Sequence, residues 1–477
     1  MRILHKWSRF VFLFVVITAI LIPVNVIADD AETQRLKEEV RQLKSENQQF
    51  KQRLERLESL LLNQNQSAQP EKNTVKKPET HQNKDKELVI LNDPEKLQRE
   101  SDHTKSYADI LGETETVAED KPEKSLTIGG AFWLNYANKS WQSKDEGKKG
   151  GFNFDMFRLD VDATQGDFIL DTQWRFYSYM NTIHHGWIGY KFEEDNQVEL
   201  GVTQVPFGLR PWMSHNYFFS LGYYIGLEDD YDAGIKWTSK YDNLDLELAY
   251  FRNEELGDAS NFERYSVDVA VTDEQRNEEV DQFNAVVRYT MKHSQDFETE
   301  FGLSGLYGGL YNRDTHDTGD HWATAAHLDS KYKYWNLELQ WAKYAYNPES
   351  PDSEDPRLDH LITFSNLASS TQVAAKGDLY VFNITRDFNV DWGPISHLNC
   401  YNDYSYIDKK ESSFKDSQLN TTGCLVTAGP TLIYVDIING KNAWYLNDPS
   451  GTYESNMGTG GNDDWETRFN INFEYYF

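Results

Sequence analysis

Residues 466–477 have the sequence Glu466-Thr467-Arg468-Phe469-Asn470-Ile471-Asn472-Phe473-Glu474-Tyr475-Tyr476-Phe477. From Arg468 to Glu474, polar and apolar residues alternate strictly, and Tyr475 and Phe477 continue the apolar positions. A period of two places the apolar side chains on one face of a β-strand and the polar side chains on the other. This strand therefore has one face suited to lipid and one suited to water. A soluble edge strand so apolar would be an aggregation hazard.

The same period of two recurs backwards through the chain as far as Leu126, as in Leu244-Asp245-Leu246-Glu247-Leu248. It predicts sixteen strands. They begin near Leu126, Asn153, Phe168, Thr182, Asn196, Tyr231, Leu244, Asp281, Phe297, His321, Trp335, Lys376, Asp391, Gln418, Thr431 and Glu466.

The connections between these strands differ systematically in length. After even-numbered strands they are short, as at Gln165-Gly166-Asp167 and Tyr241-Asp242-Asn243. After odd-numbered strands they are mostly long, roughly 138–152, 205–230, 253–280, 311–320, 346–371, 407–417 and 441–465, with one short exception near Asn181. An aromatic-rich soluble β-sandwich, which the composition allows equally, has no reason to segregate its loops in this way. The pattern predicts an all-β fold, a 16-stranded antiparallel transmembrane β-barrel over residues 126–477.

The composition agrees with such a barrel. Mean hydropathy is -0.70, because strands that alternate lipid-facing and lumen-facing residues are polar on average. Aromatic residues make up 14% of the chain, enough for two interfacial girdles. The one continuously apolar segment lies in residues 1–28, where a basic start precedes Phe10 to Val24. We interpret it as a signal peptide cleaved after Ala28, with a retained signal anchor as the alternative. The mature chain would then enter an oxidising compartment.

Residues 29–63 show a heptad pattern that predicts a short α-helical coiled coil ahead of the barrel. Its seam consists of Leu36, Val40, Leu43, Asn47, Phe50, Leu54, Leu57 and Leu61. The seam implies self-association in two or three strands, and an isolated amphipathic helix is the alternative. Residues 64–125 are polar and poor in aromatics, which predicts a flexible periplasmic linker.

A sixteen-stranded barrel is too wide for its side chains to fill, so an aqueous channel is expected. The third long loop, from Val205 to Asp230, combines apolar anchors with charges, and we expect it to fold inward as a constriction. The expected constriction residues are Arg210, His215, Glu228, Asp229 and Asp230. The alternatives are a surface loop packed on its neighbours or a trimer contact.

Charge suggests which ions such a channel would prefer. Residues 1–125 contain 22 of the 77 acidic and 20 of the 47 basic residues of the chain. The barrel therefore contains 55 acidic and 27 basic residues, a net charge of -28. A lumen sharing this bias would favour cations or neutral solutes. Several carboxylates, such as Glu254, Glu255, Glu278 and Glu279, fall in expected external loops. There they could bind divalent cations, contact lipopolysaccharide or be solvated.

Two segments resemble a known family. The strand-to-loop segment of phosphate-selective O/P-type porins is similar to Val198-Glu199-Leu200-Gly201 leading into Val205-Pro206-Phe207-Gly208. An early strand of that family resembles Phe157-Arg158-Leu159-Asp160. The resemblance implies a homotrimer with loop three inside each pore, and it allows an N-terminal periplasmic coiled coil. The acidic barrel departs from anion-selective members, so we do not carry over phosphate selectivity. The C-terminal aromatics Phe473, Tyr475 and Phe477 resemble the signal recognised by the barrel-assembly machinery.

The remaining candidates concern cysteine and histidine. Cys400 and Cys424 lie symmetrically about residue 412, which predicts a disulfide across a hairpin, or two free thiols if the register slips by one residue. His184 and His185 are adjacent on a strand and should point to opposite faces, so they should not bind one ion. No metal, cofactor or catalytic site is expected, although a Ser-His-acid site assembled across strands stays an alternative.

The sequence thus predicts a porin of the bacterial outer membrane for passive diffusion of small hydrophilic solutes, with a cation preference or weak selectivity and its N-terminal segment in the periplasm. A structural tether using the coiled coil and linker is the second hypothesis, and a lipid-acting barrel enzyme the third. The expected partners are outer-membrane lipid, lipopolysaccharide, the barrel-assembly machinery, further copies of the chain and peptidoglycan. Nucleic acid is not expected, because an acidic barrel repels phosphate.

Overall fold

The computed structural model describes residues 124–141, 150–193, 195–349, 356–446, 456–461 and 463–477. The predicted signal peptide, the coiled-coil seam from Leu36 to Leu61 and nearly all of the predicted linker lie outside the described residues. In the part of the chain that is described, no helix is both long and apolar enough to cross a membrane.

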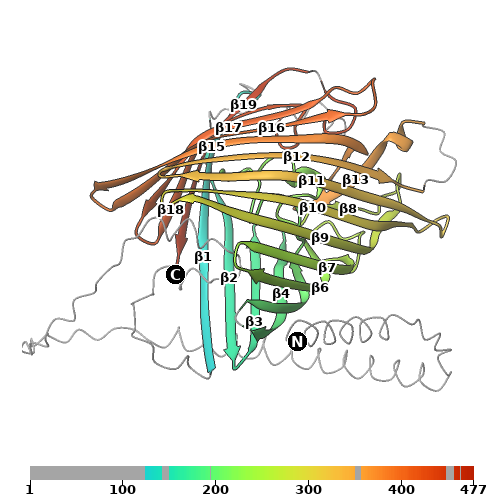
Figure 1. Cartoon of the computed structure of the whole chain (residues 1–477). Coiled ribbons are helices and arrows are strands. Elements are labelled where there is room, and N and C mark those ends of the chain that lie inside the picture. The colour runs from blue at the N-terminus through green and yellow to red at the C-terminus, as the bar shows by residue number, and fades with distance from the viewer. Residues whose placement is uncertain (1–123, 142–149, 194, 350–355, 447–455, 462) are drawn as a thin grey trace, which may run out of the picture. The chain divides into compact units, whose positions relative to one another are not determined.

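Sixteen strands form a closed antiparallel barrel in which every strand pairs with its neighbours in chain order (Figure 1). The strands are β1 (Lys124–Lys139), β2 (Gly151–Gln165), β3 (Phe168–Tyr177), β4 (Asn181–Glu193), β5 (Asn196–Gln204), β6 (Tyr231–Tyr241), β7 (Leu244–Glu254), β9 (Asn277–Ser294), β10 (Phe297–Asn312), β11 (Thr318–Tyr332), β12 (Trp335–Asn347), β15 (Lys376–Trp392), β16 (Ile395–Lys409), β17 (Ser417–Ala428), β18 (Thr431–Lys441) and β19 (Glu466–Tyr476).

The predicted fold class and strand count are confirmed, and β19 closes the barrel against β1. Seven predicted starts are displaced by one to four residues, among them those of β2 (Gly151 rather than Asn153), β4 (Asn181 rather than Thr182), β11 (Thr318 rather than His321) and β17 (Ser417 rather than Gln418). β1 begins at Lys124 rather than Leu126, and β9 begins at Asn277 rather than Asp281. The thirteenth barrel strand begins at Ile395 rather than Asp391, because β15 continues to Trp392 before the chain turns.

Seven connections of two residues each lie at one end of the barrel. They are 166–167, 194–195, 242–243, 295–296, 333–334, 393–394 and 429–430. Several begin with a positive backbone φ, as at Gly166 (58°) and Gly429 (58°), which suits the right-handed twist of the paired strands. We call this end the short-turn end. Both the start of β1 and the end of β19 lie at it, since they pair with strand ends beside these turns.

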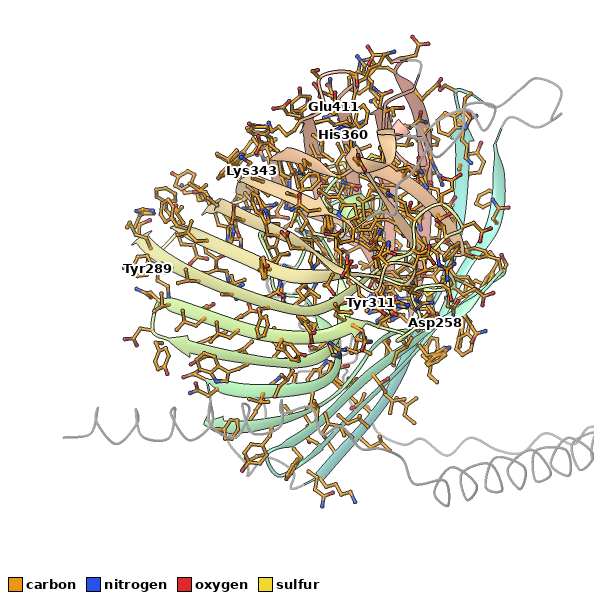
Figure 2. The ribbon with its side chains drawn as sticks, turned by 90° about the vertical axis from the view of Figure 1, so that its right-hand side faces the viewer. Asp258, Tyr289, Tyr311, Lys343, His360 and Glu411 are labelled. Carbon is orange, nitrogen blue, oxygen red and sulfur yellow. A yellow bond between two sulfur atoms is a disulfide. The ribbon has the colours of Figure 1, made fainter. Side chains whose placement is uncertain are left out.

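The longer connections meet at the opposite, long-loop end. A small sheet of order β14-β13-β8, formed by β8 (Asp268–Val269), β13 (Leu361–Asn366) and β14 (Ser369–Ala374), lies within them. Two 3-10 helices, η2 (Tyr223–Ile225) and η3 (Pro356–His360), belong to the same connections. Figure 2 shows His360 and Glu411 close together, where their side chains join two connections at 3.7 Å.

The outer face of the barrel carries exposed apolar side chains in bands. Aromatic residues ring the short-turn end, namely Phe168, Phe192, Tyr241, Tyr289, Tyr332, Trp335 and Trp392. Aliphatic residues follow, including Ile188, Leu200, Leu248, Leu303 and Leu339. A second aromatic band, with Phe152, Phe176, Phe283, Tyr307 and Trp341, comes next. This order of aromatic, aliphatic and aromatic side chains is the one a bilayer requires of a barrel wall.

The inside of the barrel is partly filled, contrary to the expectation of an interior too wide to fill. Buried apolar residues of the connections, such as Leu221, Phe364 and Trp444, join inward-facing apolar residues of the wall, such as Leu379 and Ile407, in one cluster. Side chains of the strands alone would leave the interior open. The long connections supply the additional volume, so an apolar core occupies part of the lumen.

Candidate functional site

The connection from β5 to β6, residues 205–230, folds into the barrel, and we call it the inner loop. Its apolar side chains Phe207, Leu209, Met213 and Leu221 are at most 2% exposed and belong to the apolar core. Gly208 has φ +63°, and a Cβ there would lie 2.4 Å from Gln340 Oε1 on β12. The glycine therefore permits the loop backbone to approach the wall closely.

Hydrogen bonds attach this loop to strands far from its own ends. The backbone N–H of Gly208 donates to Ser304 of β10 (2.9 Å), and that of Leu209 donates to Gln340 Oε1 of β12 (2.7 Å). Farther along, Asn383 of β15 donates to the carbonyl of Met213 (2.9 Å). Since β5 and β6 lie on another part of the wall, the loop crosses the lumen.

The tip of the loop is fixed by a carboxylate of β16. Asp403 accepts hydrogen bonds from the backbone N–H groups of His215 (2.8 Å) and Asn216 (3.1 Å). The His215 ring lies between two carboxylates, 3.0 Å from Asp403 Oδ1 and 3.5 Å from Glu338 Oε1. Burial alone would lower the pKa of His215, but Glu338 and Asp403 outweigh it and hold that pKa well above 6.5. The ring is therefore cationic at neutral pH.

The acidic end of the loop is buried rather than spread along a pore surface. Glu228 accepts hydrogen bonds from the N–H of Met213 and from the N–H and hydroxyl of Ser220, so it braces the loop internally. Burial raises the pKa of Glu228 to about 7, although these hydrogen bonds oppose the shift. Asp229 accepts hydrogen bonds from the hydroxyls of Tyr231 and Tyr265.

Beside the loop lies a cavity of about 650 Å³. Its lining includes Lys333 and Tyr334, which form a turn at the short-turn end. It also includes Tyr179 and Tyr445, which belong to connections at the long-loop end. Arg210, His215 and Asp229 line it between these ends, whereas Glu228 and Asp230 do not. The cavity therefore extends along the barrel, and the inner loop forms part of its wall.

The charges of the lining are balanced, unlike those of the whole barrel. Among the described lining residues the basic ones are Arg158, Arg175, Arg210, Lys331, Lys333 and Arg468, and the acidic ones are Asp155, Asp229, Asp329, Glu338, Asp387 and Glu474. The assumption that the lumen shares the net charge of -28 is therefore wrong for this cavity. Most carboxylates of the barrel lie elsewhere.

Three of the lining arginines lie over aromatic rings. Arg468 lies 4.3 Å from the Phe218 ring centroid and Arg158 lies 5.3 Å from that of Tyr476. Arg175 lies 4.3 Å from the Tyr265 ring centroid. Such stacking holds a guanidinium in place without neutralising it. Neither Arg175 nor Arg468 was predicted as a pore residue from the sequence. The alternation in the C-terminal strand does predict that Arg468 faces inward, because it alternates with lipid-facing residues.

The expectation for His184 and His185 is wrong. The β3–β4 pairing shifts register between Gln173, which pairs with His185, and Trp174, which pairs with Ile183, so His184 is the extra residue of a β-bulge. Both histidines consequently face inward and are buried, with their Nδ1 atoms 2.8 Å apart. A bulge breaks the strict alternation on which the sequence argument rested.

The two cysteines face each other across β16 and β17 and form a disulfide in the structure. Asn402 and Thr422 form the next pair along the ladder on the same face, and Asn402 Nδ2 donates a hydrogen bond of 2.6 Å to the Thr422 hydroxyl. Of the C-terminal aromatics, Phe473 and Tyr475 lie on the outer side of β19, opposite the buried Asn472 and Glu474. The Phe477 ring stacks on Phe157.

No family model and no curated protein matches this chain. Similar solved structures include the outer-membrane-expressed OmpT of Vibrio cholerae, which is 13% identical with a TM-score of 0.46; the match covers 75% of this chain and 99% of that one. An anion-selective porin from Comamonas acidovorans is 12% identical with a TM-score of 0.45, and the match covers 74% of this chain and 100% of that one. The outer membrane channel DcaP of Acinetobacter baumannii is 10% identical with a TM-score of 0.46, and the match covers 76% of this chain and 99% of that one. The similarity is one of fold, and the resemblance to phosphate-selective O/P-type porins is not confirmed.

Proposed function

We propose that the barrel is an outer-membrane porin through which small hydrophilic solutes diffuse, with weak selectivity between ions. The observation that carries the proposal is the cavity of about 650 Å³ whose lining includes residues of both barrel ends. The inner loop narrows it with Arg210, His215 and Asp229, so these three are the constriction residues of the proposal. The balanced lining supports weak selectivity rather than the cation preference suggested by the net charge.

The banded outer face supports insertion in lipid, and the predicted signal peptide supports export to the outer membrane. Barrels of this kind place their short turns in the periplasm. Since β1 begins at the short-turn end, the predicted coiled coil would be attached on the periplasmic side. There it would assist a homotrimer and could contact peptidoglycan. The proposal also includes recognition of Phe473, Tyr475 and Phe477 by the assembly machinery.

The test is planar-bilayer recording of the purified protein in a tenfold KCl gradient. We expect discrete conductance steps and a reversal potential far below the ~59 mV of an ideally selective pore for a monovalent ion. A reversal potential close to that limit would contradict the balanced lining. A protein that is soluble without detergent and conducts no ions would contradict the porin itself.

A deletion separates transport from tethering. Removing residues 30–123 should leave single-channel conductance unchanged if the barrel alone carries transport. Loss of envelope integrity at normal permeability would show that the tether is the principal role.

A further inference from the structure

Six carboxylates gather at the long-loop end, where the inner loop joins β6 and the connection 255–276 covers the junction. They are Asp230, Asp232, Glu254, Glu255, Asp268 and Glu279, and we call them the acidic cluster. Each is at most 7% exposed. In Figure 2, Asp258 marks the same connection at this end of the barrel. Of the alternatives expected for Glu254, Glu255 and Glu279, solvation is therefore wrong, and the binding of a divalent cation stays open.

The cluster holds more negative charge than its basic neighbour balances. Arg264 is fully buried beside it, with Nη1 3.4 Å from Asp268 and Nη2 3.9 Å from Glu254. Six carboxylates and this one guanidinium leave a formal charge of -5. Such a cluster needs protons or a bound cation to remain folded.

The geometry inside the cluster favours a cation. One carboxylate oxygen each of Asp230, Asp232 and Asp268 lies within 4.8 Å of the others. Moreover, Asp232 Oδ1, Asp268 Oδ1 and Glu255 Oε2 are buried and have no hydrogen-bond partner in the described part of the chain. Buried polar oxygens are nearly always paired, so these three atoms favour the binding of a cation.

We propose that Asp230, Asp232 and Asp268 bind a divalent cation of the calcium type. Donors that are all carboxylate oxygens select hard cations. Ca²⁺ lies about 2.3–2.6 Å from its ligands and so bridges oxygens up to about 5 Å apart, whereas Mg²⁺ at about 2.0–2.1 Å bridges only about 4 Å. The upper limit of 4.8 Å on the distances between the three aspartate oxygens is compatible with the larger ion.

The site joins two separate segments. Asp230 is the last residue of the inner loop and Asp232 the second residue of β6, whereas Asp268 belongs to β8 of the small sheet. A bound ion therefore fastens the base of the inner loop to the connection above it. This replaces the expectation that the chain has no metal site, and it does not depend on the proposed transport function.

The test is calcium titration of the full chain in detergent at neutral pH after removal of metals with EDTA. We expect saturable binding of one Ca²⁺ per chain, with a dissociation constant no weaker than about 10⁻³ M, the weak end of extracellular calcium sites. EDTA should also lower the thermal unfolding temperature, and added Ca²⁺ should restore it.

A double variant, Asp232→Asn with Asp268→Asn, should weaken binding at least tenfold and abolish the effect of EDTA. The matched control, Glu263→Gln with Asp273→Asn, removes the same charge from exposed positions of the same connection and should bind as the wild type does. Absence of saturable binding to the wild-type chain overturns the proposal whether or not the variant folds. A double variant that binds Ca²⁺ as tightly as the wild type also overturns the proposal. The same holds if Ca²⁺ does not change the stability of the wild type and the double variant is more stable than it, since protons would then neutralise the cluster.

Discussion

Asp403 anchors the tip of the inner loop, and its replacement by alanine should release that tip. The carboxylate accepts four hydrogen bonds, from the backbone N–H and Nδ1 of His215 and from the backbone N–H and Nδ2 of Asn216, at 2.8–3.1 Å. Removing one partner of a buried charged pair costs about 3–5 kcal/mol. Asp403→Ala should therefore weaken docking of the tip by a factor between about a hundred and a few thousand.

Two measurements follow the tip directly. Single-channel recording should show added noise and substates, because the loop forms part of the cavity wall. Amide hydrogen exchange should accelerate at His215 and Asn216, whose N–H groups lose their acceptor. The barrel strands should exchange as before.

A control distinguishes anchoring from the loss of any buried carboxylate. Asp160 of β2 is also buried, and it pairs with Arg158 of its own strand at 2.9 Å. Asp160→Ala should leave exchange at the loop tip unchanged. The reasoning is refuted if Asp403→Ala alters neither exchange at His215 and Asn216 nor the channel noise, or if both variants act alike.

Three further predictions concern the same region. The pKa of His215 is raised in the folded protein, so the charged ring stabilises loop docking fully below about pH 6.5, and this stabilisation is lost as the pH rises through the folded-state pKa. Channel noise should therefore rise with alkaline pH, and His215→Gln should remove that dependence. Gly208→Ala should cost about 1–2 kcal/mol for the left-handed backbone alone and should speed amide exchange at Leu209, and an unchanged rate would contradict the close approach to β12. Arg468→Gln should shift the reversal potential towards cation selectivity, whereas Lys343→Gln, which removes a charge from the outer face, should not.

The barrel could be predicted because its decisive features are local in sequence. A period of two gives each strand, and two-residue turns such as those at Gly166 and Gly429 fix the pairing of its neighbours. The small sheet could not be predicted in this way, because β13 is buried on both faces by other connections and shows no alternation. The bulge at His184 shifts the register without any glycine or proline at that position to mark it.

The inner loop was predictable in part. Its apolar anchors suggested inward folding, and Arg210, His215 and Asp229 do line the cavity. Its partners on β10, β12, β15 and β16 are distant in sequence, so no local pattern specifies them. The apolar core in the lumen did leave a trace. Ile438 of β18 belongs to that core and follows the outward-facing Ile437, so apolar residues are consecutive there instead of alternating with polar ones.

The balanced lining means that the net charge of the chain and the charges along its cavity are two different electrostatic properties. The isoelectric point of about 4.8 is set by carboxylates of which few line the cavity. Ion-exchange behaviour and long-range attraction of counterions would follow the acidic majority, while a permeating ion meets six basic and six acidic lining side chains together with the His215 ring. The exterior of this barrel could therefore gain or lose many charges during evolution while the permeation path kept its electrical character.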